Sequence, residues 1–446
     1  LCFVMQQFRE WTSAIASSEH YGIRGYCPEL IISSSLEENV LRALGCKISP
    51  ERSDLFRATI VSHCSHGLTG QSTLATALGA TIGNDVFGSI LAGFITGAGT
   101  RHILALPLAA EELLTCKTLN ADGIDSFVEA RRKRRQPVYG FGHRFHDVDP
   151  RAEKIVELLA RYFPDALELA TLCAIETSTR RRFRASANID GAGAAALLVL
   201  GVPIEVMSLV NFAGRGPAYV AHYDEIAHML THRHGIKLVD LAQGLAASYG
   251  PEQIVRSEIT RVQPNLLATR DINQQEIIGS FTLEQMLALL FDRYPLSPES
   301  SLILRAIIGT YSIHSLGDVD VSVVRLAADH KVDFIFAACG ALLAAKSSLS
   351  LSSYLDQEDK SAADTQRIRL LDDLAKKSGV RVRERSSSWR TLAIALLESI
   401  GIPSRFYEVL PIVGRIGILA AHYIERRNEK HGPFPMVALM HPPAEP

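Results

Sequence analysis

Apolar residues along this chain recur mostly at the spacing of an amphipathic helix. In residues 35–45, 149–163 and 281–294 they stand three and four positions apart, which places them on one face of a helix. Long stretches in which apolar and polar residues alternate between hairpin turns do not occur. The pattern therefore predicts an all-α fold.

One apolar segment, residues 191–214, could be mistaken for a membrane span. Pro203 and Glu205 interrupt it near its middle, and the apolar run before them is only long enough for a buried core helix. The chain starts at Leu1, which leaves its true start open, and no basic region followed by an apolar stretch indicates a signal peptide. We expect no membrane association.

The second half of the chain contains a degenerate copy of the first half. Residues 188–225 and 388–425 share Gly-x-Pro, Gly-Arg and Ala-His-Tyr in the same order without a gap. Residues 35–51 resemble 282–299, so the separation between the copies shrinks from about 247 residues to 200. Unrelated amphipathic helices can look alike, but an ungapped match of this length argues for a repeat.

The repeat predicts a domain boundary within residues 250–262. It divides the chain into a first copy, 1–255, and a second copy, 256–446. The second copy is shorter by about 47 residues, and the Ser- and Asp-rich segment 347–366 marks where it was cut down. The stretch 139–152 has no counterpart there.

Composition and charge exclude several classes of function. Hydrophobic residues make up 47% and charged residues 21%, a globular balance. A net charge of −2 gives no global field for nucleic acid or an anionic membrane, so any basic site must be local. The seven cysteines are odd in number, widely spaced and free of CxxC, which argues against a disulfide framework or zinc site and favours a reduced, cytoplasmic setting.

The most unusual short stretch is YGFGHRFHDVDPRA, residues 139–152. Gly140 and Gly142 permit a tight loop and a close backbone approach around His143. Asp149, which a proline follows, has the features of a helix N-cap. The alternative is an ordinary turn with a surface histidine.

Two basic runs lie near this loop in the sequence. The first, residues 131–135, directly precedes it, and a local cluster in a near-neutral protein fits an anion site for phosphates. The second, residues 180–184, lies shortly before Asp190. Either run could instead be a solvated charged face. The arginines of the first run are Arg131, Arg132, Arg134 and Arg135.

Asp190 stands at the head of a predicted helix rich in small residues. It could simply cap that helix, but beside an apolar wall its pKa would rise enough for it to take a proton from carbon. In the second copy Arg390 occupies this position. Weaker candidates are His63, His66, His102, Arg151 and Arg215. The histidines lack a carboxylate or cysteine at zinc-ligand spacing, and no nucleophile elbow, Walker loop or Rossmann fingerprint is present.

Five ordered segments of the first copy resemble the citrate synthase family. They are the histidine loop (138–152), the helix that bears Asp190 (187–203), the Gly-Arg to Ala-His-Tyr segment (214–225), an Arg-Gly-Tyr element (23–31) and a histidine helix (65–81). Residues 12–235 are similar to the short branch that includes citryl-CoA lyase. The resemblance implies a citrate synthase-like helical fold with a large and a smaller domain in each copy. The smaller domain would span roughly 105–210 and be truncated in the second copy.

The resemblance also implies a Claisen-type condensation of an acyl-CoA, such as acetyl-CoA, with a 2-oxoacid, such as oxaloacetate. Asp190 would remove the α-proton, His102 would hydrogen-bond to the thioester oxygen, and His143 would polarise the ketone. In reverse, the same groups would cleave a citryl-CoA type thioester. No permanently bound cofactor or metal is implied. His66, Arg151 and Arg215 would bind the carboxylates of the substrate. The residues that would bind CoA are Arg131, Arg132, Arg134, Arg135, Gly140 and Gly142.

One departure from the family pattern leaves an alternative open. Ile103 and Leu104 stand where the family has glycines beside His102. Bulky residues there could narrow the CoA slot, change the substrate or abolish the chemistry. The alternative function is a catalytically inactive protein that binds CoA or carboxylates.

The second copy lacks counterparts of the proton-abstracting, enol-stabilising and ketone-polarising residues, so we interpret it as non-catalytic. It retains His314, Arg415 and His422. Members of the family form two-fold dimers in which one subunit lends an arginine to the other. We hypothesise that the second copy replaces the partner subunit and that Arg426 or Arg427 reaches the first copy's site. The chain would then be a monomeric pseudo-dimer, with a homodimer as the alternative.

Overall fold

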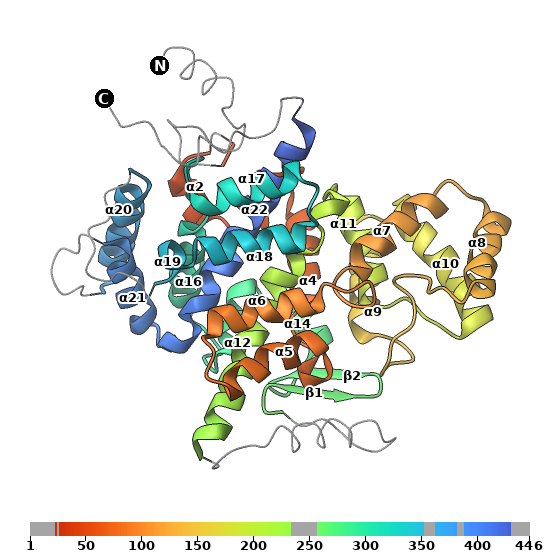
Figure 1. Cartoon of the computed structure of the whole chain (residues 1–446), viewed down its shortest axis with the longest axis horizontal. Helices are drawn as coiled ribbons and strands as arrows, with labels where there is room; N and C mark the ends of the chain where they lie inside the picture. Colours follow the sequence, from red (N-terminus) through yellow and green to blue (C-terminus); the bar gives the residue numbers. More distant parts are fainter. Residues whose placement is uncertain (1–22, 25, 233–256, 352–361, 381–387, 430–446) are drawn as a thin grey trace. The chain divides into compact units, whose positions relative to one another are not determined.

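The computed structural model describes residues 23–24, 26–232, 257–351, 362–380 and 388–429 (Figure 1). These residues are mostly helical, which confirms the all-α fold. The chain divides into two compact units. We call residues 47–295 the central unit, and residues 1–46 together with 296–446 the split unit.

The central unit holds the helices that carry the predicted site. These helices are α4 (Pro50–Ser62), α5 (Gln71–Thr81), α6 (Val86–Gly97), α7 (Ala105–Cys116), α8 (Ala121–Lys133), α9 (Pro150–Tyr162), α10 (Leu167–Phe183), α11 (Ile189–Leu200), α12 (Leu209–His232), α14 (Gln274–Ser280) and α15 (Leu283–Leu290). Two 3-10 turns, η1 (Gly67–Thr69) and η2 (Ile204–Val206), and three strands, β1 (Thr260–Gln263), β2 (Leu266–Thr269) and β3 (Ile272–Asn273), lie between them.

The split unit combines two N-terminal helices with the C-terminal part of the chain. Its elements are α2 (Pro28–Ser33), α3 (Leu36–Leu44), α16 (Pro298–Thr310), α17 (Val319–Asp329), α18 (Phe334–Ala344), α19 (Lys346–Leu349), α20 (Ala362–Lys377), α21 (Trp389–Ser399), η3 (Ser404–Val409) and α22 (Leu410–Asn428).

The hydrophobic spacing located helices well and missed a small sheet. Residues 35–45 and 149–163 form α3 and α9, and the pattern at 281–294 yields the shorter α15. Strands β1, β2 and β3 pair antiparallel in that order and form a small sheet that the pattern of apolar residues did not predict. Strands of four and two residues are too short to show the alternation by which hairpins are recognised.

The helices of the two predicted copies follow the same order. Helices α4 and α16 both begin with a proline after a serine N-cap, Ser49 and Ser297. Helices α11 and α12 lie at the positions that align with α21 and α22 in the sequence. Where the first copy has α7, α8 and α9 between α6 and α10, the described part of the second copy has only the four-residue α19 between α18 and α20. This order supports the predicted repeat.

The two compact units do not coincide with the two predicted copies. Helices α2 and α3, from the start of the first copy, pack on α16 and α22 in the split unit. Helices α14 and α15, from the start of the second copy, pack reciprocally on α4 and α12 in the central unit. Each copy therefore begins in the unit that holds most of the other copy. The boundary predicted near residue 255 lies outside the described residues.

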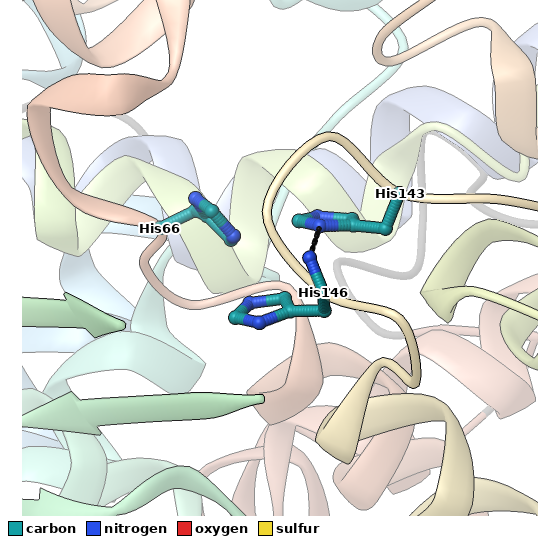
Figure 2. A group of neighbouring side chains, drawn as sticks. All are labelled: His66, His143 and His146. Atoms are coloured by element: carbon teal, nitrogen blue, oxygen red, sulfur yellow. Dashed lines mark hydrogen bonds between the residues drawn. The ribbon is translucent and has the colours of Figure 1, made fainter. Parts of the chain in front are cut away.

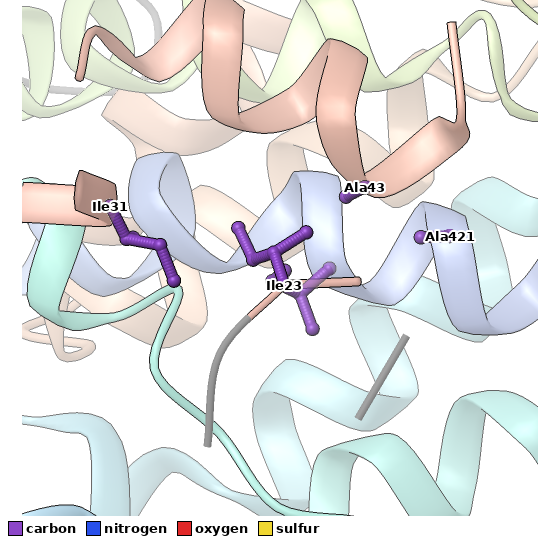
Figure 3. Packing of buried hydrophobic residues seen from close by; sticks show 5 residues of the cluster. Ile23, Ile31, Ala43 and Ala421 are labelled. Atoms are coloured by element: carbon purple, nitrogen blue, oxygen red, sulfur yellow. The ribbon is translucent and has the colours of Figure 1, made fainter. Parts of the chain in front are cut away.

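A small apolar core holds the first described residues to the split unit. Ile23, Ile31, Ala43, Ile418 and Ala421 form a buried cluster in which Ile23 and Ile31 have no exposed surface (Figure 3). The cluster joins helices α2 and α3 to α22, the last described helix. Burying an isoleucine side chain of this kind contributes about 1.5–3 kcal/mol to the free energy of unfolding. These contacts therefore hold α2 and α3 against α22.

Within the described ranges, no helix combines the length and the apolar character that crossing a membrane requires. The apolar segment 191–214 divides between α11, η2 and the start of α12, and most of its side chains are buried in the central unit. Pro203 follows the end of α11, as the sequence suggested.

Candidate active site

Loops and helix ends of the central unit bring the predicted site residues together. His66 lies just before η1, His143 lies in the loop before α9, and Arg151 is in the first turn of α9. Asp190 is the second residue of α11, and Arg215 lies on α12. The charges of Arg151 and Arg215 act on Asp190 and on His66, which places these groups in one electrostatic environment.

The two glycines of the histidine loop are required by its backbone. Gly140 has a φ of +83°, and a Cβ added to it would lie 2.5 Å from the Cα of Gly191 in α11. The carbonyl of Gly140 accepts a hydrogen bond from Asn188 N at 2.9 Å, and the carbonyl of Gly142 accepts one from Asn188 Nδ2 at 2.7 Å. These contacts fix the loop against the start of α11. Direct contact of either glycine with CoA stays a prediction.

We expect Gly140→Ala to destabilise the protein by more than about 1 kcal/mol, because alanine is strained at positive φ and its Cβ would overlap Gly191. Gly83→Ala is a control for φ alone, since Gly83 has a φ of +69° and open space around it. Gly99→Ala is the second control, because Gly99 has neither a positive φ nor an atom close to where its Cβ would stand. Urea-induced unfolding measures the three changes. Equal losses of unfolding free energy for Gly140→Ala and Gly83→Ala would contradict the expectation that the close approach of Gly140 to Gly191 adds to the effect of positive φ.

His143 is held as a neutral ring that carries its proton on Nε2. Its Nδ1 accepts a hydrogen bond from the backbone N–H of Phe145, at 3.1 Å. It accepts a second one from the backbone N–H of His146, at 3.2 Å (Figure 2). Burial and the charge of Arg151 lower the pKa of His143 to about 3. Arg151 Nη2 lies 3.5 Å from His143 Nε2, at the limit of a hydrogen bond, so the two shorter backbone contacts to Nδ1 decide the tautomer and the hydrogen is on Nε2. His143 can therefore donate a hydrogen bond to a carbonyl oxygen, as the resemblance implied.

A buried carboxylate orients the guanidinium of Arg151. Asp149 Oδ1 accepts from Arg151 Nε at 2.9 Å, and Asp149 Oδ2 accepts from Arg151 Nη2 at 2.8 Å. Oδ2 also accepts from Ile189 N at 3.0 Å, which ties α9 to the start of α11. Burial would raise the pKa of Asp149, but the Arg151 charge holds it well below its usual value. Arg151 Nη1 has no hydrogen bond to any described residue, so it can bind a ligand carboxylate.

Asp190 is not the cap of its helix. Asn188 is the N-cap of α11, and its Oδ1 accepts from the backbone N–H groups of Asp190 and Gly191. The half-buried Asp190 carboxylate makes no hydrogen bond to a described residue. Burial raises its pKa to about 6, against the lowering effect of Arg151 and Arg215. A carboxylate with such a pKa is basic enough for general base catalysis near neutral pH.

His102 lies beside Arg215 and is also neutral. Arg215 Nη1 donates to His102 Nε2 at 3.1 Å, and Ser72 Oγ lies 2.6 Å from the same nitrogen. An accepting Nε2 leaves the hydrogen on Nδ1. Burial and the Arg215 charge lower the pKa of His102 to about 3. The ring therefore has an N–H donor at Nδ1, the type of group that the predicted role needs.

The bulky residue after His102 is directed into the core. Ile103 is 2% exposed, and its Cδ1 lies 2.6 Å from where a Cβ on Gly97 would stand. The absence of a side chain on Gly97 makes room for it at the end of α6. The isoleucine that replaces a family glycine is thus taken up by packing within the central unit, whereas Leu104 remains partly exposed.

The structure adds His146, which sequence reasoning did not select. One ring nitrogen each of His66, His143 and His146 lies within 4.8 Å of one nitrogen of the other two (Figure 2). The His143 and His146 rings stack with centroids 4.5 Å apart. Burial lowers the pKa of all three, to about 4 for His146. The signal was a second histidine three residues after the first in one tight loop.

Residues 11–234 match the family model described as citrate synthase, C-terminal domain, which covers half of the chain. The chain belongs to the citrate synthase family. A search of curated proteins gave no match.

Solved structures of citrate synthase-family proteins have low sequence identity to this chain. Citryl-CoA lyase from Hydrogenobacter thermophilus is 23% identical over 49% of this chain and 87% of the lyase, with a TM-score of 0.44. Citrate synthase from Thermotoga maritima is 21% identical over 46% of this chain and 55% of that protein, with a TM-score of 0.39. Citrate synthase from Pyrobaculum aerophilum is 20% identical over 48% of this chain and 61% of that protein, with a TM-score of 0.38.

In this citrate synthase-family chain, acidic partners occupy part of the basic run expected to bind CoA phosphates. Arg131 pairs with Glu112 at 2.5 Å, and Arg132 pairs with Glu129 at 2.7 Å. Arg134 and Arg135 are exposed and have no ion pair within the described ranges. The phosphate-binding role therefore stays a prediction that Arg134 and Arg135 are better placed to fulfil.

In the second copy the retained arginine, Arg415, forms internal ion pairs. Arg415 is 1% exposed and donates to Asp318 and Asp320, each at 2.6 Å. Ser72 lies six residues after His66, as Asp320 lies six residues after His314. Asp320 therefore places a carboxylate where the first copy has the uncharged side chain of Ser72. This arrangement supports the interpretation of the second copy as non-catalytic.

One of the two arginines expected to reach the first copy's site is committed elsewhere. Arg426 is buried in the split unit, where it pairs with Asp329 and Glu429 at 2.7 and 2.5 Å. A buried guanidinium with two carboxylate partners is not available to a substrate, so the prediction for Arg426 is corrected. Arg427 is exposed, and its role stays a prediction.

Proposed function

We propose that this protein forms or cleaves a carbon–carbon bond at an acyl-CoA thioester through an enol intermediate. The observation that carries the proposal is Asp190, a carboxyl group with a pKa of about 6 in the environment of neutral imidazoles and two arginines. Perturbed carboxylates of this kind are suited to removing a proton from carbon. The partner substrate is a 2-oxoacid, because Arg151 and Arg215 provide charge for its carboxylates.

In the condensation direction Asp190 accepts the proton from the α-carbon of the thioester. The His102 Nδ1–H stabilises the negative charge that develops on the thioester oxygen. The enol carbon then forms a bond to the ketone carbon, while His143 Nε2–H hydrogen-bonds to the ketone oxygen, which takes up a proton supplied by water and becomes a hydroxyl group. Acetyl-CoA and oxaloacetate are the substrate pair that the family membership favours.

The reverse reaction needs the same groups with the proton transfers reversed. The hydroxyl proton passes to water while His143 Nε2–H hydrogen-bonds to the oxygen that becomes the ketone, the carbon–carbon bond breaks to give the 2-oxoacid and the enol, and protonated Asp190 gives a proton to the α-carbon. Citryl-CoA is the matching substrate, and citryl-CoA lyase is among the similar structures. The classification of the protein as an acyltransferase and the direction of the reaction, synthesis or cleavage, are therefore both part of the proposal.

The test supplies each direction separately. Condensation of acetyl-CoA with oxaloacetate gives citryl-CoA, and water must then cleave its thioester to release citrate and the free CoA thiol. We expect the purified chain to release free thiol by these two steps, or to release oxaloacetate from citryl-CoA. Thiol release is followed with a colorimetric reagent, and oxaloacetate is followed through a coupled dehydrogenase. A panel of longer acyl-CoAs and other 2-oxoacids extends both assays. CoA binding without turnover of any substrate would contradict the proposal and favour an inactive binding protein.

A further inference from the structure

We propose that His146 is a substrate-contacting residue that donates a hydrogen bond from Nε2 to an oxygen of the 2-oxoacid or its hydroxy product, and that Asn265 positions it. The inference rests on the proposed function for the class of ligand. His146 is 4% exposed, and its Nε2 is buried without a hydrogen-bond partner among the described residues. A buried polar atom without a partner is costly, so a ligand oxygen that satisfies it would be bound favourably.

The proton of His146 is placed by its neighbour. Its Nδ1 accepts a hydrogen bond from Asn265 N at 2.9 Å. A neutral ring that accepts at Nδ1 carries its hydrogen on Nε2. His146 therefore resembles His143 in tautomer, and the stacked pair offers two N–H donors on the loop before α9.

Asn265 holds the whole histidine loop from the turn between β1 and β2. Its Oδ1 accepts from the backbone N–H groups of Asp147 at 2.9 Å and Val148 at 3.3 Å. Its φ is +55°, a conformation that asparagine adopts more readily than most residues. With the bond from its N–H to His146, one asparagine makes three hydrogen bonds to the loop. The small sheet thereby fixes the position of the added imidazole.

The third ring of the cluster complements these donors. Thr69 Oγ1 donates to the carbonyl of His66 at 2.6 Å, so it accepts from His66 Nδ1 at 2.8 Å. His66 Nε2 is then a buried lone pair without a partner. Two donors and one acceptor match a hydroxyl oxygen, which accepts from His143 and His146 and donates to His66. The ketone oxygen of a 2-oxoacid becomes such a hydroxyl during condensation.

The same tautomers argue against a metal ion at this cluster. A histidine that binds a metal through Nε2 donates its Nδ1–H to a carboxylate or carbonyl. Here the Nδ1 atoms of His143 and His146 face backbone N–H donors instead. Only His66 has a free lone pair, and one imidazole does not make a metal site.

The test replaces the ring donor and measures ligand affinity directly. We expect His146→Phe to weaken binding of oxaloacetate and L-malate about 10- to 100-fold by calorimetry, as for loss of a hydrogen bond to a charged ligand. The KM for the 2-oxoacid should rise by the same factor, with the KM for acyl-CoA unchanged. His146→Gln, which keeps a donor, should recover part of the loss. His330→Phe is the matched control on an exposed histidine.

Asn265 is tested as a positioning residue. Asn265→Gly keeps the backbone at positive φ and removes Oδ1, so it should raise the KM for the 2-oxoacid without changing that for acyl-CoA. Asn265→Asp keeps the acceptor and should restore the affinity. Thermal melts of all variants separate loss of affinity from loss of the fold.

The outcomes distinguish this inference from the proposed function. Dicarboxylate binding that weakens in His146→Phe, in a protein that turns over no acyl-CoA, would support the inference and reject the proposed function. Turnover and dicarboxylate affinity that His146→Phe leaves unchanged would overturn the inference alone. It would also be overturned by a wild-type protein that binds neither oxaloacetate nor L-malate, or by Zn²⁺ binding that disappears in His146→Phe.

Discussion

Asp190→Asn is expected to lower turnover of an acyl-CoA substrate by about 10²- to 10⁴-fold, the usual contribution of a general base. The amide keeps the shape of the side chain but cannot accept the α-proton. Asn188 caps α11 in either case, so the helix start does not depend on the Asp190 carboxylate. Steady-state kinetics and exchange of the α-protons with deuterated solvent measure the loss. Asp165→Asn, at an exposed position, is the matched control.

The raised pKa of Asp190 also sets a direction for pH dependence. The rate should increase with pH through about 6, as the carboxyl group becomes the ionised base. For stability the sign is opposite. A folded-state pKa above the unfolded value means that the favourable contribution of the protonated form is lost as pH rises through about 6. Asp190→Asn should therefore raise the melting temperature at pH 8 and not below pH 4. A variant that is inactive and also destabilised at pH 8 would contradict this account.

The sequence predicts the helices and the residues whose roles depend on local geometry. The proline after Asp149 marks the start of α9, where the Asp149 side chain accepts from Arg151 N. The glycines around His143 predict a tight loop, and Gly140 adopts positive φ. What the sequence cannot reveal is the partner of that loop. The contact between Gly140 and Gly191 joins residues 51 positions apart, and no local pattern specifies it.

Residues missed or misjudged in the sequence depend on long-range contacts. Asn265 reaches His146 across more than a hundred positions of sequence, through a sheet too short to be recognised. Arg426 looked available because it follows the Ala-His-Tyr segment, but its partner Asp329 lies far from it in the chain. Ile103 looked obstructive beside His102, yet Gly97 makes room for it. Each of these outcomes is decided by what packs against the residue, which composition and spacing do not show.

Asp149→Ala is expected to reduce the free energy of unfolding by about 3–5 kcal/mol, the cost of leaving a buried charge without its partner. Asp149 and Arg151 are 1% and 3% exposed, so solvent cannot replace the lost interaction. The change also removes the acceptor for Ile189 N and the N-cap of α9. Urea-induced unfolding at pH 7 measures the loss, with Asp165→Ala as the control at an exposed aspartate.

The cause of this loss can be separated by a second substitution and by pH. Arg151→Met in the Asp149→Ala background removes the unpaired charge and should recover part of the stability. Because the folded-state pKa of Asp149 is depressed, its contribution is present above the unfolded pKa of about 3.9 and is lost as pH falls further. The difference between wild type and Asp149→Ala should therefore shrink below pH 4. A difference that is the same at pH 7 and pH 3 would mean that packing, and not the ion pair with Arg151, holds α9 against α11.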